Sequence, residues 1–156
     1  MNVLFVDLEN VCRSPLAEAI LKKKFKEHHI HGEVDSAGFE SFTINEPPDK
    51  RVVNVALKHG YAPEGMARIF RKEDFDLFDK IYVMDTQNYN DVMALAKKDQ
   101  HKEKVEYLLD VLDDGKNKTV PNPYNTGESD CENIFELLDK ATDKIVELAR
   151  AEKQNA

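Results

Sequence analysis

The chain has 156 residues, of which 22 are lysine or arginine and 30 are aspartate or glutamate, so its formal net charge is −8. This length suits one domain, which we place at residues 1–156. The negative charge argues against non-specific binding to nucleic acid or to an anionic membrane, because both need a basic surface. No apolar run approaches the ~20 residues that a membrane-spanning helix needs.

Two cysteines, Cys12 and Cys131, lie far apart in the sequence and in no metal-ligand spacing. They indicate reduced thiols more than a disulfide framework. The N-terminus begins directly with a strand pattern and shows no secretory leader, so we expect a cytoplasmic protein.

Short apolar runs alternate with helical patterns along the chain. This order predicts a three-layer α/β domain with a four-stranded parallel sheet flanked by helices. Val3–Val6 is the first predicted strand, and Glu33–Ser36 is the second. Between them we expect a helix that Ser14 caps and that carries Pro15 in its first turn.

The second half of the chain continues the alternation. We first expect a helix that ends near Gly60 and has an apolar side made of Val52, Val53, Ala56 and Leu57. A strand at Ile81–Met84, a helix at Gln87–Lys97 and a strand at Val105–Leu109 should follow. A long loop at Asp113–Ser129 then leads to a last helix at Asp130–Ala151. The four strands end near one edge of the sheet, where open α/β sheets bind their ligands.

The loop Asp7–Ser14 connects the first strand to the first helix. Its backbone N–H groups, the helix N-terminus and the Arg13 guanidinium favour an anion-binding cradle. A loop of this shape normally presents a nucleophile at its first position. Here that position holds Asp7, and Glu9 adds a second carboxylate two residues later.

Further landmarks follow this loop in a fixed order. The loop and helix start contribute Asn10, Cys12, Arg13, Ser14, Pro15, Ala17 and Glu18, and the later landmarks are Asp35-Ser36-Ala37-Gly38, Pro47-Pro48-Asp49-Lys50-Arg51, Ala67-Arg68, Lys72-Glu73-Asp74-Phe75, Met84-Asp85, Val120-Pro121-Asn122-Pro123-Tyr124 and Ser129-Asp130. With these residues the chain resembles the low-molecular-weight protein tyrosine phosphatases, from about Asn2 to Ala151. The resemblance implies the phosphatase-I-like fold.

The resemblance also implies roles for individual residues. Arg13 would clamp the anion, and the rest of a phosphate-binding loop (P-loop) would come from Leu8, Glu9, Asn10, Val11, Cys12 and Ser14. Phe42 and Tyr124 match aromatic residues that line the family's cleft, where they would suit a phosphotyrosine ring. Each of these two aromatics also fits a residue that is merely half-buried in packing.

The sequence departs from the family at both chemical positions. Asp7 stands where the nucleophilic cysteine belongs, and Asn122 stands where the general-acid aspartate belongs. Glu9 replaces a glycine, and Cys12 matches the second loop cysteine, so we interpret Cys12 as a small buried residue. Two carboxylates ~5 Å apart at a dielectric of ~20 cost about 3 kcal/mol. We therefore expect a catalytically inactive homologue, a pseudophosphatase that binds or regulates a partner.

Asp7 itself admits two interpretations. As an internal substitute for phosphate, its carboxylate would accept bonds from the loop amides and pair with Arg13, which would lower its pKa. Taken alone, an aspartate between a strand and a helix is also typical of a turn or cap residue. Asn122 likewise fits a simple Asn-Pro turn.

The partner that the loop implies is a phosphotyrosine-containing or acidic protein. We expect no cofactor and no metal. His28, His29 and His31 lie at a helix end, where exposed imidazoles are common, so we do not assign them to a metal site.

Two enzymatic alternatives remain. In the first, Asp7 is the nucleophile of a weak phosphomonoesterase or tyrosine phosphatase. In the second, the strand ending in Asp7-x-Glu9 resembles the first motif of magnesium-dependent phosphatases of the haloacid-dehalogenase type. Asp113 and Asp114 would then supply further metal ligands.

Overall fold

The computed structural model describes residues 1–123 and 128–154. Across this part of the chain, four parallel strands form one sheet in the order β2-β1-β3-β4. The strands are β1 (Val3–Val6), β2 (Val34–Ala37), β3 (Lys80–Val83) and β4 (Val105–Tyr107). The predicted sheet of four parallel strands is confirmed.

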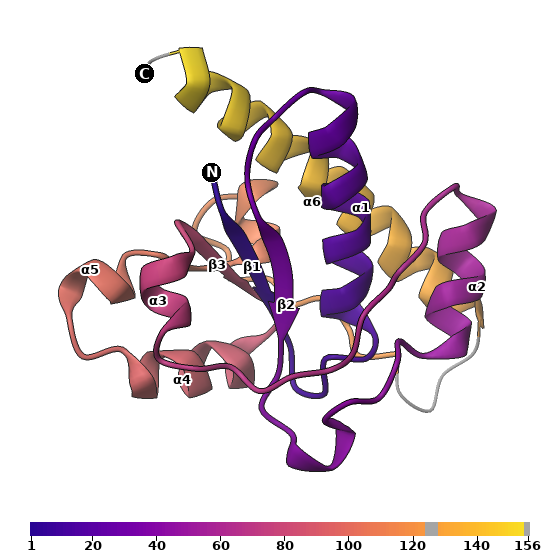
Figure 1. The fold of residues 1–156 in the computed structure, drawn as a ribbon, viewed down its shortest axis with the longest axis horizontal. Coiled ribbons are helices and arrows are strands. Elements are labelled where there is room, and N and C mark those ends of the chain that lie inside the picture. Colours follow the sequence, from indigo (N-terminus) through magenta and orange to yellow (C-terminus); the bar gives the residue numbers. More distant parts are fainter. Residues whose placement is uncertain (124–127, 155–156) are drawn as a thin grey trace.

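Helices cover both faces of this sheet (Figure 1). The helical elements are α1 (Arg13–Glu27), η1 (Ser41–Thr43), α2 (Lys50–Lys58), α3 (Asp74–Leu77), α4 (Thr86–Leu95), α5 (Asp99–Lys102), η2 (Leu108–Val111) and α6 (Glu128–Gln154). Residues of α1, α2 and α6 share one hydrophobic core cluster, whereas residues of α3 and α4 belong to a second. The molecule therefore has the three layers that the alternating pattern predicts.

The pleat of the central strand explains the two clusters. Val3 and Phe5 belong to the cluster with α1 and α6, while Leu4 and Val6 belong to the cluster with α3 and α4. All four side chains are fully buried, because β1 has a neighbouring strand on each side and helices on both faces.

Several predicted boundaries shift. β4 ends at Tyr107 because the chain turns into η2, and α6 begins before Asp130 and extends past Ala151. α1 begins at Arg13, so the prediction that Ser14 caps it was wrong. Leu57 is 57% exposed, and Val55 takes its expected place in the core. The short helices α3 and α5 were not predicted, since four residues carry too little periodicity.

The sheet places two loops side by side. β1 ends at Val6 and β3 ends at Val83, and these two residues are paired across the sheet. The residues that follow them, Asp7 and Met84-Asp85, therefore emerge at the same edge. Among the described residues, no helix is both long and apolar enough to cross a membrane.

Candidate functional site

The Asp7 carboxylate is held inside its own loop. Asn10, whose φ of 59° reverses the chain, donates its backbone N–H to Asp7 Oδ1 at 2.5 Å. The backbone N–H of Ser14 donates to Asp7 Oδ2 at 2.9 Å. Asp7 is only 2% exposed. Both carboxylate oxygens thus accept loop amides, as expected, and Asp7 satisfies a free N–H in the first turn of α1 as a cap residue does.

Burial dominates the ionisation of Asp7. It raises the pKa of this carboxyl above its ordinary value, because the charged form loses its water. The Arg13 charge and the bonds from Ser14 and Asn10 act in the opposite direction but do not overcome burial. The prediction of a lowered pKa was therefore wrong.

Arg13 forms its ion pair with Asp85. Its Nη1 donates to Asp85 Oδ2 at 2.9 Å and to the carbonyl oxygen of Val120 at 2.8 Å. Asp85 also accepts the backbone N–H of Asn88 at 2.9 Å and so caps α4. The predicted ion pair with Asp7 was wrong: Asp85, at the end of the neighbouring strand, takes the guanidinium instead.

Cys12 and Glu9 are the other two ionisable residues of the loop besides Asp7 and Arg13. Cys12 is buried, and burial, together with the charges of Asp49 and Asp7, raises the pKa of its thiol far above the usual range. This side chain is a neutral packing group, as expected. Burial, followed by the charges of Asp7 and Glu40, also raises the pKa of Glu9. An approaching phosphate would meet the same negative field.

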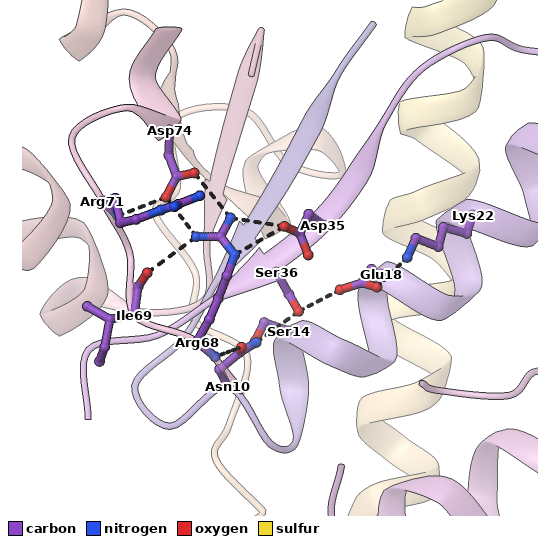
Figure 2. Close-up of polar contacts among 10 residues, drawn as sticks. All are labelled: Asn10, Ser14, Glu18, Lys22, Asp35, Ser36, Arg68, Ile69, Arg71 and Asp74. Atoms are coloured by element: carbon purple, nitrogen blue, oxygen red, sulfur yellow. Dashed lines mark hydrogen bonds and ion pairs between the residues drawn. The ribbon is translucent and has the colours of Figure 1, made fainter. Parts of the chain in front are cut away.

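The other side of the loop is a network of hydrogen bonds (Figure 2). Asn10 Nδ2 donates to Ser14 Oγ and to Ser36 Oγ, both at 2.8 Å. Asn10 Oδ1 accepts the backbone N–H of Arg68 at 3.0 Å. Ser36 Oγ in turn donates to Glu18 Oε1 at 2.7 Å. One side chain, Asn10, thus connects the loop to α1, to β2 and to the segment before α3.

Arg68 extends this network towards the second core. Its guanidinium lies between Asp35 of β2 and Asp74 of α3, with the closest contact to each at 3.0 Å (Figure 2). Asp74 is fully buried and also accepts the backbone N–H of Arg71 at 2.8 Å. These two ion pairs hold Arg68 in place, and the backbone N–H of Arg68 is the donor to Asn10 Oδ1.

The remaining loop residues act through their backbones. The carbonyl oxygen of Leu8 accepts the N–H groups of Phe39 and Glu40 at 2.8 and 3.0 Å, and that of Val11 accepts the N–H of Asp49 at 2.8 Å. These bonds tie the loop to the two segments that flank it.

Two of the predicted cleft residues can be placed. Phe42 lies in η1 and is 70% exposed. Asn122 is exposed and lies two residues after Val120, whose carbonyl oxygen holds Arg13. Tyr124 lies outside the described residues. The chain therefore brings Asn122 to the neighbourhood of the loop, where the resemblance puts the general acid.

Sequence reasoning missed Asp85, Ser36 and Thr43 as site residues. Thr43 is buried and donates its hydroxyl to the carbonyl oxygen of Glu9 at 2.8 Å. Asp85 had a usable signal, because a carboxylate directly after β3 must emerge beside the loop that follows β1. Ser36 lay within the landmark Asp35-Ser36-Ala37-Gly38, which gave it no role of its own, and Thr43 had no signal, since hydroxyl residues of this kind are common in turns.

The geometry does not bring Asp113 and Asp114 to Asp7. Asp113 pairs with Lys118 at 2.9 Å, and Asp114 lines a cavity of about 280 Å³ with Glu106 and other residues. In the described part of the chain, no three histidine, cysteine, aspartate or glutamate side chains converge as a metal site would require.

Comparison with known proteins agrees with this architecture. A sequence profile of the family described as low molecular weight phosphotyrosine protein phosphatase matches residues 2–155. The Bacillus subtilis low molecular weight protein-tyrosine-phosphatase YfkJ is 33% identical over 99% of both chains. The low molecular weight phosphotyrosine protein phosphatase of Homo sapiens is 37% identical over 86% of this chain and 87% of its own.

The same fold occurs in a crystal structure of a protein tyrosine phosphatase from Entamoeba histolytica. It superposes with a TM-score of 0.90 at 33% identity, covering 98% of this chain and 99% of that one. The matched residues include the loop, the network behind it and the sheet edge that carries both. This chain belongs to the low molecular weight phosphotyrosine protein phosphatase family.

Proposed function

We propose that this chain is a pseudophosphatase: a member of the family that does not hydrolyse phosphate esters and instead binds or regulates a partner protein. One observation carries the proposal. The carboxylate at the first loop position is buried, and each of its oxygens accepts an amide of the loop that should cradle phosphate.

The residues of the loop offer no thiolate that could attack phosphorus. Cys12 is buried with a strongly raised pKa, and thiolate is the form that attacks. Asp7 would have to break its bonds to Asn10 and Ser14 before it could attack. It would also meet a phosphate dianion beside Glu9, at a cost of about 3 kcal/mol for each like-charge pair ~5 Å apart.

The leaving group would lack help as well. Asn122 stands where the resemblance puts the general acid, and an amide cannot donate a proton as an acid does. Losing general acid catalysis typically slows a reaction by ~10²–10⁴-fold. The missing nucleophile and the missing acid affect the same turnover, so their effects combine.

The names of the relatives favour the alternative. The relatives from Bacillus subtilis and Entamoeba histolytica are called protein tyrosine phosphatases, and the family and its human member are called phosphotyrosine protein phosphatases. If this chain keeps such an activity, its nucleophile is Asp7, and turnover must disappear in Asp7→Asn. If it keeps only the recognition, the ligand is a phosphotyrosine-containing protein held by the remaining loop amides.

The test is turnover of p-nitrophenyl phosphate and of a phosphotyrosine peptide between pH 5 and 8, with and without magnesium. We expect no release of phosphate above that of a heat-treated sample. Turnover that Asp7→Asn abolishes would contradict the proposal. Turnover that depends on magnesium would point instead to the haloacid-dehalogenase type of chemistry.

A further inference from the structure

Two adjoining cavities lie at the end of α1 that is opposite to the loop Asp7–Ser14. The first has a volume of about 390 Å³ and is lined by His28, Ile30, Arg150 and Lys153. The second, of about 230 Å³, shares Ile30 and Lys153 with the first and is completed by Met1, His31, Ala149 and Glu152. The 15 residues of α1 put about 22 Å between the loop and these cavities. Figure 1 shows the N-terminus and the last turns of α6 on that far side.

The first cavity carries an excess of positive charge. Three of its four lining residues, His28, Arg150 and Lys153, are basic, and none is acidic. All three are exposed, and in the described part of the chain none of them forms an ion pair. Lys24, one turn before His28 on α1, is different, because it pairs with Asp139 at 2.7 Å. On a chain whose net charge is −8, unpaired basic side chains around one cavity indicate a site for an anion.

The second cavity supplies an apolar floor that is already formed. Met1 and Ile30 pack against the core cluster of α1, α2 and α6, and Ala149 belongs to that cluster. The backbone N–H of Ile30 donates to the carbonyl oxygen of Phe25 at 2.8 Å. Gly32 lies so close to Met1 that an added Cβ would clash with the Met1 carbonyl oxygen. A floor packed in this way needs little ordering when a ligand binds, which favours affinity.

We propose that the two cavities form one binding site for a small organic phosphate. In the first cavity, Arg150 and Lys153 supply two positive charges, and the His28 ring supplies an N–H donor in either charge state. Two positive charges match the charge of about −1.5 to −2 that a phosphate ester carries near neutral pH, whereas a carboxylate carries only one. The apolar or aromatic remainder of the ligand packs on Ile30 and Met1 in the second cavity. The first cavity also falls within the ~300–1,000 Å³ that is typical of small-molecule sites.

This inference goes beyond the proposed function, because none of the residues that line the cavities belongs to the loop Asp7–Ser14. The two proposals fail separately. Phosphate release in the turnover assay contradicts only the proposed function, and absence of binding at the cavities contradicts only this inference. Since a phosphate group can also approach the loop, the experiment must show where the ligand binds as well as whether it binds.

The experiment titrates 1-naphthylmethylphosphonate into the ¹⁵N-labelled full chain at pH 7.5 and follows the backbone amides by NMR. The phosphorus of this probe is bonded to carbon, so a phosphatase activity could not hydrolyse it. We expect saturable shifts at residues 28–31 and 149–153. Methylphosphonate, which lacks the ring, and 1-naphthylacetate, which lacks the second charge, should each bind at least tenfold more weakly. No saturable shift, shifts confined to the amides of Asn10 and Ser14, equal binding of either reference compound, or tighter binding of a ten-residue polyglutamate would overturn the inference.

Variants test the assigned charges. The double variant Arg150→Gln, Lys153→Gln should bind 1-naphthylmethylphosphonate at least tenfold more weakly than the parent, because the phosphonate loses both positive charges. The matched control is the double variant Arg71→Gln, Lys98→Gln, which removes the same two residue types at exposed positions that line neither cavity. Thermal melting of both variants confirms folding. Equal losses of affinity in the two double variants would overturn the assignment.

Discussion

The two sides of the loop Asp7–Ser14 differ in how their polar groups are satisfied. On the inner side, the side chain of Asn10 forms three hydrogen bonds, to Ser14, to Ser36 and to the backbone of Arg68. On the outer side, Asp7 and Glu9 carry carboxylates whose pKa values burial raises. The inner side determines the shape of the loop, and the outer side determines what the loop can bind.

This difference shows that the frame and the chemistry of the site are physically separable. The side chains of Asn10, Ser14 and Ser36 hold the loop through neutral bonds to one another, and these side-chain bonds do not involve the first loop position. The carboxylate of Asp7 fits into that frame because the loop supplies two amides to it. The loop thus keeps its shape while two of its amides are occupied by a side chain of its own.

The largest expected effect comes from rebuilding the outer side alone. The triple variant Asp7→Cys, Glu9→Gly, Asn122→Asp should release phosphate from p-nitrophenyl phosphate, because the inner frame is already in place. The double variant that keeps Asn122 is the matched control, and it should be ~10²–10⁴-fold slower, the usual loss without a general acid. If the triple variant folds but releases no phosphate, the hydrogen-bonded frame of Asn10, Ser14 and Ser36 is not sufficient to support catalysis, and our account of it is wrong.

The next effect tests the inner side. Asn10→Ala removes three buried hydrogen bonds at a φ of 59° and should lower the free energy of unfolding by about 3 kcal/mol. Asn117 offers the matched control, because it is exposed and has a φ of 51°. Asn117→Ala should cost only about 1 kcal/mol of backbone strain. Urea unfolding measures both, and equal losses would contradict the role assigned to Asn10.

A smaller effect concerns the pH dependence of stability. Because the pKa of Asp7 is raised by folding from an ordinary value of 3.8, the folded chain binds more protons here than the unfolded one. The contribution of Asp7 to stability is therefore present below pH 3.8 and is lost as the pH rises through the raised pKa, with a slope of at most about 1.4 kcal/mol per pH unit. The difference in unfolding free energy between the parent and Asp7→Asn, measured from pH 4 to 8, isolates it. A difference that grows in favour of the parent with pH would mean that the pKa is lowered.

The smallest effect concerns the connection between the loop and η1. Thr43→Val removes the hydroxyl that bonds to Glu9 and should cost about 1 kcal/mol in unfolding free energy. Thr119→Val, at an exposed position, is the control, and urea unfolding measures both variants. Equal losses would contradict the role assigned to the Thr43 hydroxyl.

The sequence was sufficient for the strands and for the loop, because both depend on local patterns. The apolar run Val3–Val6 forms β1 at the predicted bounds, and Asn10 and Ser14 occupy the loop as the resemblance implies. The cap of α1 was missed for a physical reason. The chain folds back so that Asp7, seven residues before Ser14, reaches the helix N-terminus and replaces the local cap.

The partner of Arg13 shows what the sequence does not determine. Asp7 lies close to Arg13 along the chain, but Asp85 lies 72 residues away and reaches the guanidinium through the pairing of β1 with β3. The predicted lowering of the Asp7 pKa was wrong for a related reason. It assumed that the Arg13 charge acts more strongly on Asp7 than burial does. The partner of Arg13 and the direction of the Asp7 pKa both depend on the three-dimensional arrangement. The sequence of the loop alone determines neither burial nor a contact across the sheet.

The central claim is that Asp7 occupies the place of phosphate in its own loop. It is tested most directly by titrating inorganic phosphate into the parent protein and into Asp7→Ala by isothermal calorimetry. Removing the carboxylate frees the amides of Asn10 and Ser14 and removes one negative charge, so Asp7→Ala should bind phosphate at least tenfold more tightly than the parent. If the two proteins bind phosphate equally, Asp7 is not the occupant of the loop and the account is wrong.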